Sequence, residues 1–194
     1  MSDFVVVNIL DLMDAIGEEE LQRVLSDFSC SKNDEIENFV RKNAIEFAKR
    51  KMSITYLVID EKSRVAAMFA LTHKAVQIVC EGLSSSVKKK IKRYAQLDEE
   101  TGTFTLSSFL IGQFGKNYQY QDILKLEGKQ LMEAAFGVLR HVQREIGGGV
   151  VYLECEEKPQ LLEFYQNDAN RFRIFGERFS SLEGIKYIQM LKIF

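Results

Sequence analysis

The chain has 194 residues, of which 46% are hydrophobic and 28% are charged, and its net charge is −2. This length and composition indicate a globular protein with a substantial core, and they exclude a disordered or fibrous chain. The slightly acidic total argues against a general attraction to nucleic acid or to anionic membranes.

The N-terminal residues and the cysteines bear on location. Met1 to Leu12 has no basic region and contains acidic residues, so it does not resemble a signal peptide. No apolar run approaches the roughly 20 residues that span a bilayer. Cys30, Cys80 and Cys155 are odd in number and widely separated, which predicts structural thiols rather than a disulfide framework or a zinc site. We therefore expect an intracellular, cytoplasmic protein without a metal ion.

The first half of the chain predicts a strand, two helices and a hairpin. The strand lies within Met1 to Leu10, and the first helix covers Glu18 to Phe28. A second helix follows the capping residues at Ser31 to Asp34, with Ile36, Phe39, Val40 and Phe47 as its buried stripe. The hairpin pairs Ser53 to Asp60 with Arg64 to Thr72.

The second half alternates strands with helices. From His73 to Gly102 the pattern changes to an insert that contains a short basic helix over Val87 to Ala95. The predicted elements after it are a strand ending near Gly115, a helix over Leu131 to Val142, a strand over Val150 to Cys155, a helix that Pro159 begins, and closing strands over Arg173 to Phe179 and Ile185 to Phe194.

This order predicts a mixed, mostly antiparallel sheet flanked by helices, in the α/β (α+β) class. Turns join strand pairs at both ends of the chain, and helical crossovers lie between Gln113 and Arg173. No internal repeat, linker or low-complexity tract interrupts the sequence. We expect one domain over residues 1–194.

The stretch from Phe104 to Glu145 has the pattern of an anion site. An apolar strand with Gly112 and Gly115 near its end is followed by a polar loop, and around Gly128 the loop becomes the start of a helix. Free N–H groups and the positive end of the helix dipole would point at a phosphate there. The alternative is a plain structural connection.

These elements in this order resemble the GNAT superfamily of acetyl-CoA-dependent N-acetyltransferases over nearly the whole chain. The segment FLIGQFGKN is similar to the family's central strand, where a bulge splays two strands apart. The resemblance implies a GNAT-like sheet with a splayed central strand pair and acetyl-CoA as the co-substrate. It also implies that the backbone of Phe114, Gly115 and Lys116 pairs with the pantetheine arm.

The loop after that strand carries the family's pyrophosphate motif in altered form. The family uses Gln or Arg, two residues, Gly, one residue, and then Gly or Ala. In this chain Gly128 matches the middle glycine, Lys125 replaces the first residue, and Gln130 departs from the pattern by adding a side chain. The resemblance implies that Lys125, Gly128, Lys129, Gln130 and Leu131 bind the coenzyme.

Tyr165 is the catalytic residue that the resemblance implies. The segment YLECEEKPQLLEFYQ resembles the family's last strand and helix, and Tyr165 falls on a recurrent tyrosine that serves as general acid toward the leaving thiolate. A phenol that donates a hydrogen bond to the departing sulfur stabilises it. The alternative is that Tyr165, beside Phe164, is a core aromatic residue.

The general base that takes a proton from an attacking ammonium group is less determined. Glu154, on the strand before the Tyr165 helix, is one candidate, and His73 at the exit of a strand is another. Water can also relay the proton. His141 has the pattern of an exposed helical residue.

Several partners fit the sequence. The chain looks most like the GNAT subgroup that includes bacterial toxins acting on aminoacyl-tRNA. The basic run from Lys88 to Arg93 is either a solvated helix face or a contact for tRNA, another polyanion or the coenzyme's 3′-phosphate. The apolar C-terminal strand ending at Phe194 could also pair with a second subunit in a homodimer.

We therefore predict an acyltransferase that moves an acetyl group from acetyl-CoA to a primary amine by direct attack. The acceptor is a small molecule, a peptide or an aminoacyl-tRNA. One alternative is a GNAT-fold protein that binds acyl-CoA or a partner with little turnover. The other is a toxin-type acetyltransferase.

Overall fold

The computed structural model describes residues 4–81 and 83–194 of the chain. These residues form two compact units. Unit 1 contains the chain up to Thr72 together with Ile111–Val138, and unit 2 contains His73–Leu110 and Leu139–Phe194. The single domain over residues 1–194 stays a prediction beside this division. No helix of the described residues is long and apolar enough to pass through a membrane.

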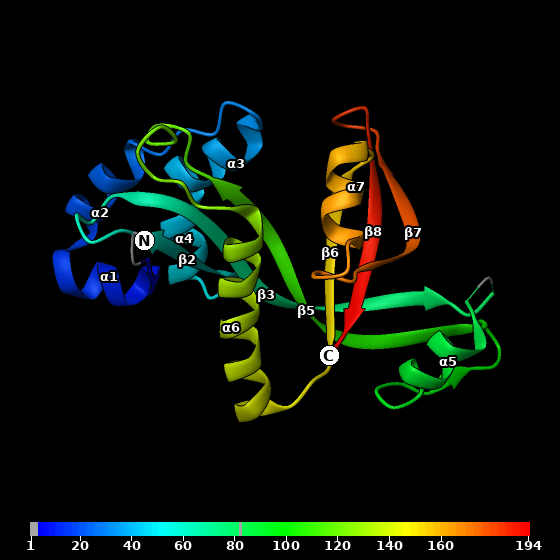
Figure 1. Ribbon diagram of the computed structural model, residues 1–194. Coiled ribbons are helices and arrows are strands. Elements are labelled where there is room, and N and C mark those ends of the chain that lie inside the picture. The colour runs from blue at the N-terminus through cyan, green and yellow to red at the C-terminus, as the bar shows by residue number, and fades with distance from the viewer. Residues whose placement is uncertain (1–3, 82) are drawn as a thin grey trace. The chain divides into compact units, whose positions relative to one another are not determined.

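The strands confirm the predicted mixed sheet (Figure 1). They are β1 Val5–Asn8, β2 Ile54–Ile59, β3 Val65–Val79, β4 Leu97–Asp98, β5 Thr103–Lys116, β6 Val150–Glu156, β7 Arg173–Ser180 and β8 Ile185–Ile193. The strand order is β1-β2-β3-β5-β6-β8-β7, with β4 on β5. The β5–β6 register is parallel, whereas those of β1–β2, β2–β3, β4–β5, β6–β8 and β7–β8 are antiparallel.

The helices also follow most of the predicted pattern. They are α1 Ile9–Ile16, α2 Glu18–Ser26, α3 Asp34–Asn38, the π-helical turn η1 Phe39–Asn43, α4 Ala44–Lys49, α5 Ser85–Ile91, α6 Gly128–Ile146 and α7 Pro159–Gln166. The predicted helix start at Gly128 is confirmed, as is the position of Pro159 in the first turn of α7. The long second helix is interrupted by the wider turn of η1.

The predicted first strand was wrong at its C-terminal end. The strand stops at Asn8, and the helix α1 begins at Ile9, where no helix was expected. Asn8 ends the strand because its side-chain oxygen accepts a hydrogen bond from the Leu10 N–H at 2.9 Å, which caps the helix. Ile9 is buried in the unit 1 core, and Met13 packs against that core one helical turn later. A short apolar run does not distinguish a strand from such a helix.

The predicted boundary at His73 was also wrong. β3 continues to Val79, so His73 is an exposed residue inside a strand and not at its exit. Beyond it, Val76 and Ile78 are buried while their neighbours are exposed, which is the alternation of a half-buried strand. The helix expected over Val87–Ala95 is α5, which starts and ends earlier, with the Ser84 side chain as its N-cap.

The C-terminal strand is not an open edge. β8 lies between β6 and β7 and is paired with both, from Val150↔Ile193 on one side and from Ser180↔Ile185 on the other. The route to a homodimer through this strand was therefore wrong, because its backbone groups are already used inside the sheet.

Each unit has its own hydrophobic core. In unit 1, the helices α1, α2 and α4 pack with β2 and β3 around a cluster that includes Leu21, Phe28 and Met68. In unit 2, a second cluster joins strand residues such as Phe104 and Tyr152 to Ile91 of α5. The helix α7 packs against β6 in the same unit.

Asn117 ties three segments of unit 1 together directly after β5. Its side-chain oxygen accepts hydrogen bonds from the Ser29 N–H at 2.9 Å and the Gln119 N–H at 3.0 Å. Its side-chain nitrogen donates to the Val65 carbonyl at 2.8 Å, and its backbone N–H donates to the Ala66 carbonyl at 2.8 Å. Asn117 is 4% exposed, so water replaces none of these bonds easily.

We expect Asn117→Ala to lower the free energy of unfolding by about 3 kcal/mol, because the change leaves buried donors and an acceptor without partners. Urea unfolding followed by circular dichroism measures this. The matched control is Asn43→Ala, at an exposed position, which should cost less than about 0.5 kcal/mol. Equal losses in the two variants would contradict the role given to Asn117.

Candidate functional site

The end of β5 carries the residues predicted to meet the pantetheine arm. Gly115 is buried, and a Cβ added there would lie 2.9 Å from Cγ2 of Ile36 and 3.8 Å from Sγ of Cys30. The glycine therefore lets the Ile36 side chain of α3 reach the strand, which is a packing reason beside the predicted functional one. Phe114 and Lys116 on either side are half-buried.

The loop between β5 and α6 is anchored to unit 1. Leu124 and Leu126 are buried at 7% and 6% exposure, whereas Lys125 and Glu127 between and beyond them are exposed. The Lys116 Nζ donates a hydrogen bond to the Leu126 carbonyl at 3.1 Å. This contact brings the end of β5 and the predicted pyrophosphate loop together within one unit.

The start of α6 carries backbone N–H groups that its own turns do not use. The first N–H groups of a helix have no intrahelical acceptor, which at this end leaves Gly128, Lys129 and Gln130 able to donate. The Gln130 side chain turns back, and its oxygen accepts a hydrogen bond from the Glu127 N–H at 2.8 Å. Lys125 and Lys129 are exposed and Leu131 is buried. The residues present therefore fit a pyrophosphate group, with the Gln130 side chain bonded to the preceding residue.

Tyr165 belongs to unit 2 and lies on α7. It is 7% exposed, and its ring meets those of Phe164 and Phe172 edge-on, with centroids 5.1 and 5.8 Å away. The Phe172 N–H donates to the Tyr165 carbonyl at 2.9 Å. Burial raises the pKa of the Tyr165 phenol well above its ordinary value. The hydroxyl therefore keeps its proton at neutral pH, as a proton donor must.

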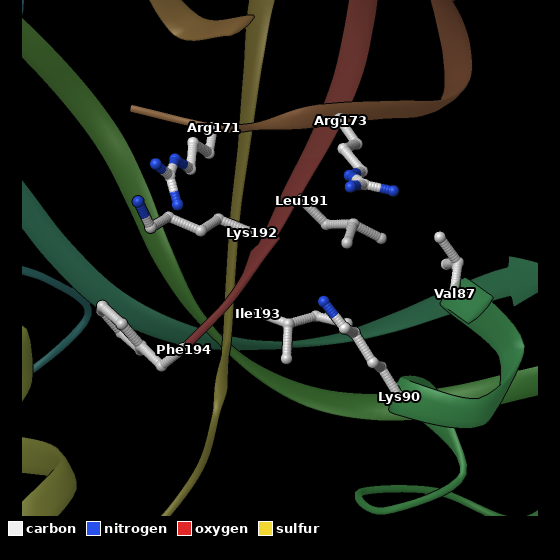
Figure 2. Close-up of a pocket in the computed structure, with 8 residues that line it drawn as sticks. All are labelled: Val87, Lys90, Arg171, Arg173, Leu191, Lys192, Ile193 and Phe194. Atoms are coloured by element: carbon white, nitrogen blue, oxygen red, sulfur yellow. The ribbon is translucent and has the colours of Figure 1, made fainter. Parts of the chain in front are cut away.

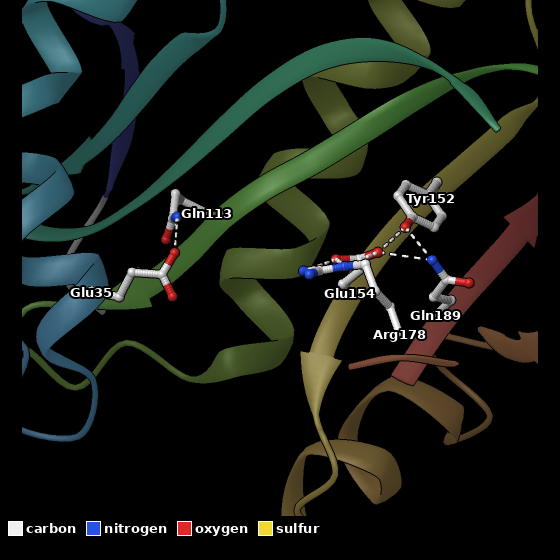
Figure 3. Close-up of polar contacts among 6 residues, drawn as sticks. All are labelled: Glu35, Gln113, Tyr152, Glu154, Arg178 and Gln189. Atoms are coloured by element: carbon white, nitrogen blue, oxygen red, sulfur yellow. Dashed lines mark hydrogen bonds and ion pairs between the residues drawn. The ribbon is translucent and has the colours of Figure 1, made fainter. Parts of the chain in front are cut away.

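Glu154 is the centre of a polar network on β6, β7 and β8 (Figure 3). Arg178 donates to the carboxylate at 2.8 and 3.0 Å, Gln189 donates at 2.9 Å, and the Tyr152 hydroxyl donates as well. Burial alone would raise the pKa of Glu154, but these hydrogen bonds outweigh it and lower the pKa to about 2. Burial and the bond to Glu154 raise the pKa of Tyr152.

The sequence interpretation found Glu154 but missed its partners. Glu154 faces Gln189 in the antiparallel register of β6 and β8, and Arg178 comes from the next strand. Only the strand pairing brings these residues together, and no local sequence pattern predicts that pairing. Gln113 and Glu35, also drawn in Figure 3, form a separate hydrogen bond of 3.2 Å in unit 1.

The remaining candidate residues are His141, the cysteines and possible metal ligands. His141 is exposed on α6, as expected. Burial raises the pKa of the Cys155 thiol to about 11, and burial also raises that of Cys30. Neither thiol is ionised at neutral pH, which agrees with their predicted structural role. Among residues 4–81 and 83–194, no three His, Cys, Asp or Glu side chains gather as a metal site would require.

Sequence comparison finds no relative of this chain: no family model matches it, and no curated protein does. Comparison of structures does find similar folds. AtaT complexed with acetyl-methionyl-tRNAfMet is 15% identical with a TM-score of 0.64, and covers 95% of this chain and 94% of its own. A tyrosine-to-phenylalanine mutant of KacT is 12% identical with a TM-score of 0.64, over 97% and 95% of the two chains.

A third solved structure, AtaTR bound with acetyl-CoA, is 14% identical with a TM-score of 0.58 and covers 97% of this chain and 94% of its own. At this level of identity the likeness concerns the fold. The predicted GNAT-like fold is confirmed: the chain has the fold of the toxin AtaT and of KacT.

Proposed function

We propose that this protein is an acetyl-CoA-dependent N-acetyltransferase that transfers an acetyl group to a primary amine. The observation that carries the proposal is the shared fold over nearly the whole chain, which includes a solved structure with bound acetyl-CoA. The open start of α6 at Gly128 supports it, because pyrophosphate binds at such helix ends.

Unit 1 supplies the coenzyme-binding residues in this proposal. The N–H groups of Gly128 to Leu131 would bind the pyrophosphate, and Lys125 and Lys129 would balance its charge. The backbone of Phe114, Gly115 and Lys116 would pair with the pantetheine arm. When bound, acetyl-CoA supplies the thioester that the amine attacks.

Tyr165 would be the proton donor to the departing sulfur. The phenol carries a proton throughout the neutral range, so it can donate a hydrogen bond to the sulfur. Tyrosine-to-phenylalanine mutants of both AtaT and KacT have solved structures.

Glu154 as general base stays a prediction. A carboxylate with a pKa of about 2 binds a proton weakly at neutral pH, and an efficient base has a pKa near the working pH. Proton transfer through a water relay requires no protonation of Glu154, so Glu154 stays hydrogen-bonded to Arg178.

The acceptor is the finer part of the proposal. An aminoacyl-tRNA is the candidate that a specific observation favours, because the AtaT structure contains acetyl-methionyl-tRNAfMet. A small molecule or a peptide amine remains an alternative acceptor. A protein that binds acyl-CoA with little turnover is the alternative function.

Gly128→Val should raise the dissociation constant of acetyl-CoA at least tenfold, on the order of 1.4 kcal/mol, because the branched side chain covers the N–H groups of α6. Titration calorimetry measures this. Gly137→Val is the matched control in the same helix, since a Cβ there meets nothing within 4 Å. Equal affinity in wild type and Gly128→Val would contradict the coenzyme site. Absence of binding by the wild type would contradict the function itself.

Tyr165→Phe should lower kcat by roughly a hundredfold or more while leaving the KM for acetyl-CoA within about twofold, because only the proton donor is lost. The ring contacts with Phe172 are kept, so the melting temperature should change little. Turnover is measured with small amines, peptides and aminoacyl-tRNA as acceptors. An unchanged kcat would remove Tyr165 from the mechanism, and binding of acetyl-CoA without turnover on any acceptor would favour the binding protein.

Glu154→Gln tests the base against a structural role. The pKa of Glu154 is below its ordinary value of 4.5, so its interactions stabilise the fold above that pH and are lost as the pH falls toward about 2. We expect the variant to lose part of this acid-dependent stability in urea unfolding between pH 5 and pH 2, and to change kcat less than about tenfold. A kcat loss of about a hundredfold or more, with stability at pH 7 unchanged, would instead assign the base to Glu154.

A further inference from the structure

A pocket with basic side chains lies within unit 2, and none of its lining residues is assigned to acetyl transfer. Its cavity volume is about 370 Å³, a size within the range of pockets that bind small organic ligands. The lining residues are Val87, Lys90, Arg171, Arg173, Leu191, Lys192, Ile193 and Phe194. They come from α5, from the loop after α7, and from the strands β7 and β8.

The floor of the pocket is apolar. Val87, Leu191 and Ile193 belong to the hydrophobic cluster of unit 2 and expose only part of their surface to the cavity. Figure 2 shows the nitrogen atoms of the four basic residues arranged around Leu191 and Ile193. A ligand with a flat apolar part and several negative charges would use both features.

The charged side chains that line the pocket are all positive. Lys90, Arg171, Arg173 and Lys192 line the cavity, and no acidic side chain does. Within the part of the chain that the structure describes, Lys90 and Arg173 form no ion pair with a carboxylate. Positive side chains that lie close together repel one another, and a bound anion reduces that repulsion.

Two of the basic side chains are held by the loop after α7. The Lys192 Nζ donates to the Asn170 carbonyl at 2.6 Å, and the Arg171 Nε donates to the Asp168 carbonyl at 2.6 Å. The bond through Nε leaves the two terminal nitrogens of the Arg171 guanidinium on its other edge, which is the geometry that grips a phosphate with paired hydrogen bonds.

Arg171 occupies a backbone conformation that favours glycine. Its φ is 55°, in the left-handed region that side chains with a Cβ adopt at a cost. Glycine would relieve this strain, yet the chain has an arginine there, lining the cavity. Arg171→Gly therefore removes the side chain from the lining without straining the backbone.

We propose that this pocket binds a nucleoside polyphosphate, with the phosphates among Lys90, Arg171, Arg173 and Lys192 and the base over the apolar floor. The four positive side chains match the charge of a nucleoside di- or triphosphate, and the cavity is of small-ligand size rather than an extended groove. This site is additional to the proposed coenzyme site and does not depend on it.

The experiment is titration of the full chain with ADP and ATP by calorimetry, repeated with the Gly128→Val variant, in which the proposed coenzyme site is covered; binding at the pocket should be the same in both. Wild type should bind both nucleotides at least about tenfold more tightly than adenosine, and the affinity should fall as salt is raised. Arg171→Gly should weaken ADP binding about tenfold or more, as the loss of charge-assisted hydrogen bonds requires, while the melting temperature stays the same or rises.

Lys51→Gly is the matched control. Lys51 is exposed in unit 1 with a φ of 58°, so the change also removes a positive charge and relieves the same strain. It should leave the affinity for ADP unchanged. Arg173→Gln, which alters no strained residue, should weaken binding as Arg171→Gly does.

The proposal is overturned if wild type gives no heat with ADP or ATP at millimolar concentration, or if adenosine binds as tightly as ADP. Equal ADP affinity in wild type and Arg171→Gly would overturn it too. A ten-residue oligoribonucleotide that binds more tightly than ADP, with the same dependence on Arg171, would make the pocket part of a nucleic-acid surface instead. A failure of acetyl-CoA to bind would leave these outcomes unaffected.

Discussion

The buried amide of Asn117 is the constraint on which the end of β5 and the loop after it depend. Its bond to Ser29 joins residues 88 positions apart, and its bonds to Val65 and Ala66 join the end of β5 to the start of β3. These contacts fix the point at which β5 stops and the loop toward α6 begins. The position of Lys116, whose Nζ reaches the Leu126 carbonyl, follows from that fixed point.

Much of the fold could be predicted because its elements carry local signals. The β2–β3 hairpin has two mostly apolar runs around a tight turn, and Pro159 marks the beginning of α7. The helix α1 and the outer part of β3 escaped prediction because their apolar runs are short and ambiguous. The Asn8 cap and packing onto the unit 1 core decided the outcome for α1, and packing onto the unit 2 core decided it for β3. Core packing depends on residues that are distant in the sequence.

The candidate site shows the same division between local and distant information. The coenzyme residues between Phe114 and Leu131 are close in sequence, so a motif could identify them. The network around Glu154 draws on β6, β7 and β8, and the pocket lined by Arg171 draws on α5, a loop and two strands. The basic run from Lys88 to Arg93 was visible in the sequence, but its partners Arg173 and Lys192 were not, because only strand register brings them together.

The order in which the two units appear along the chain has a consequence for synthesis. The residues of unit 1 all precede Leu139 in the chain. Unit 2 begins at His73 but requires β8, which pairs with both β6 and β7 and ends at Ile193. During translation every residue of unit 1 is therefore made before the last strand of unit 2, the unit that carries Tyr165. The growing chain acquires its proposed binding residues before it acquires a finished proton donor.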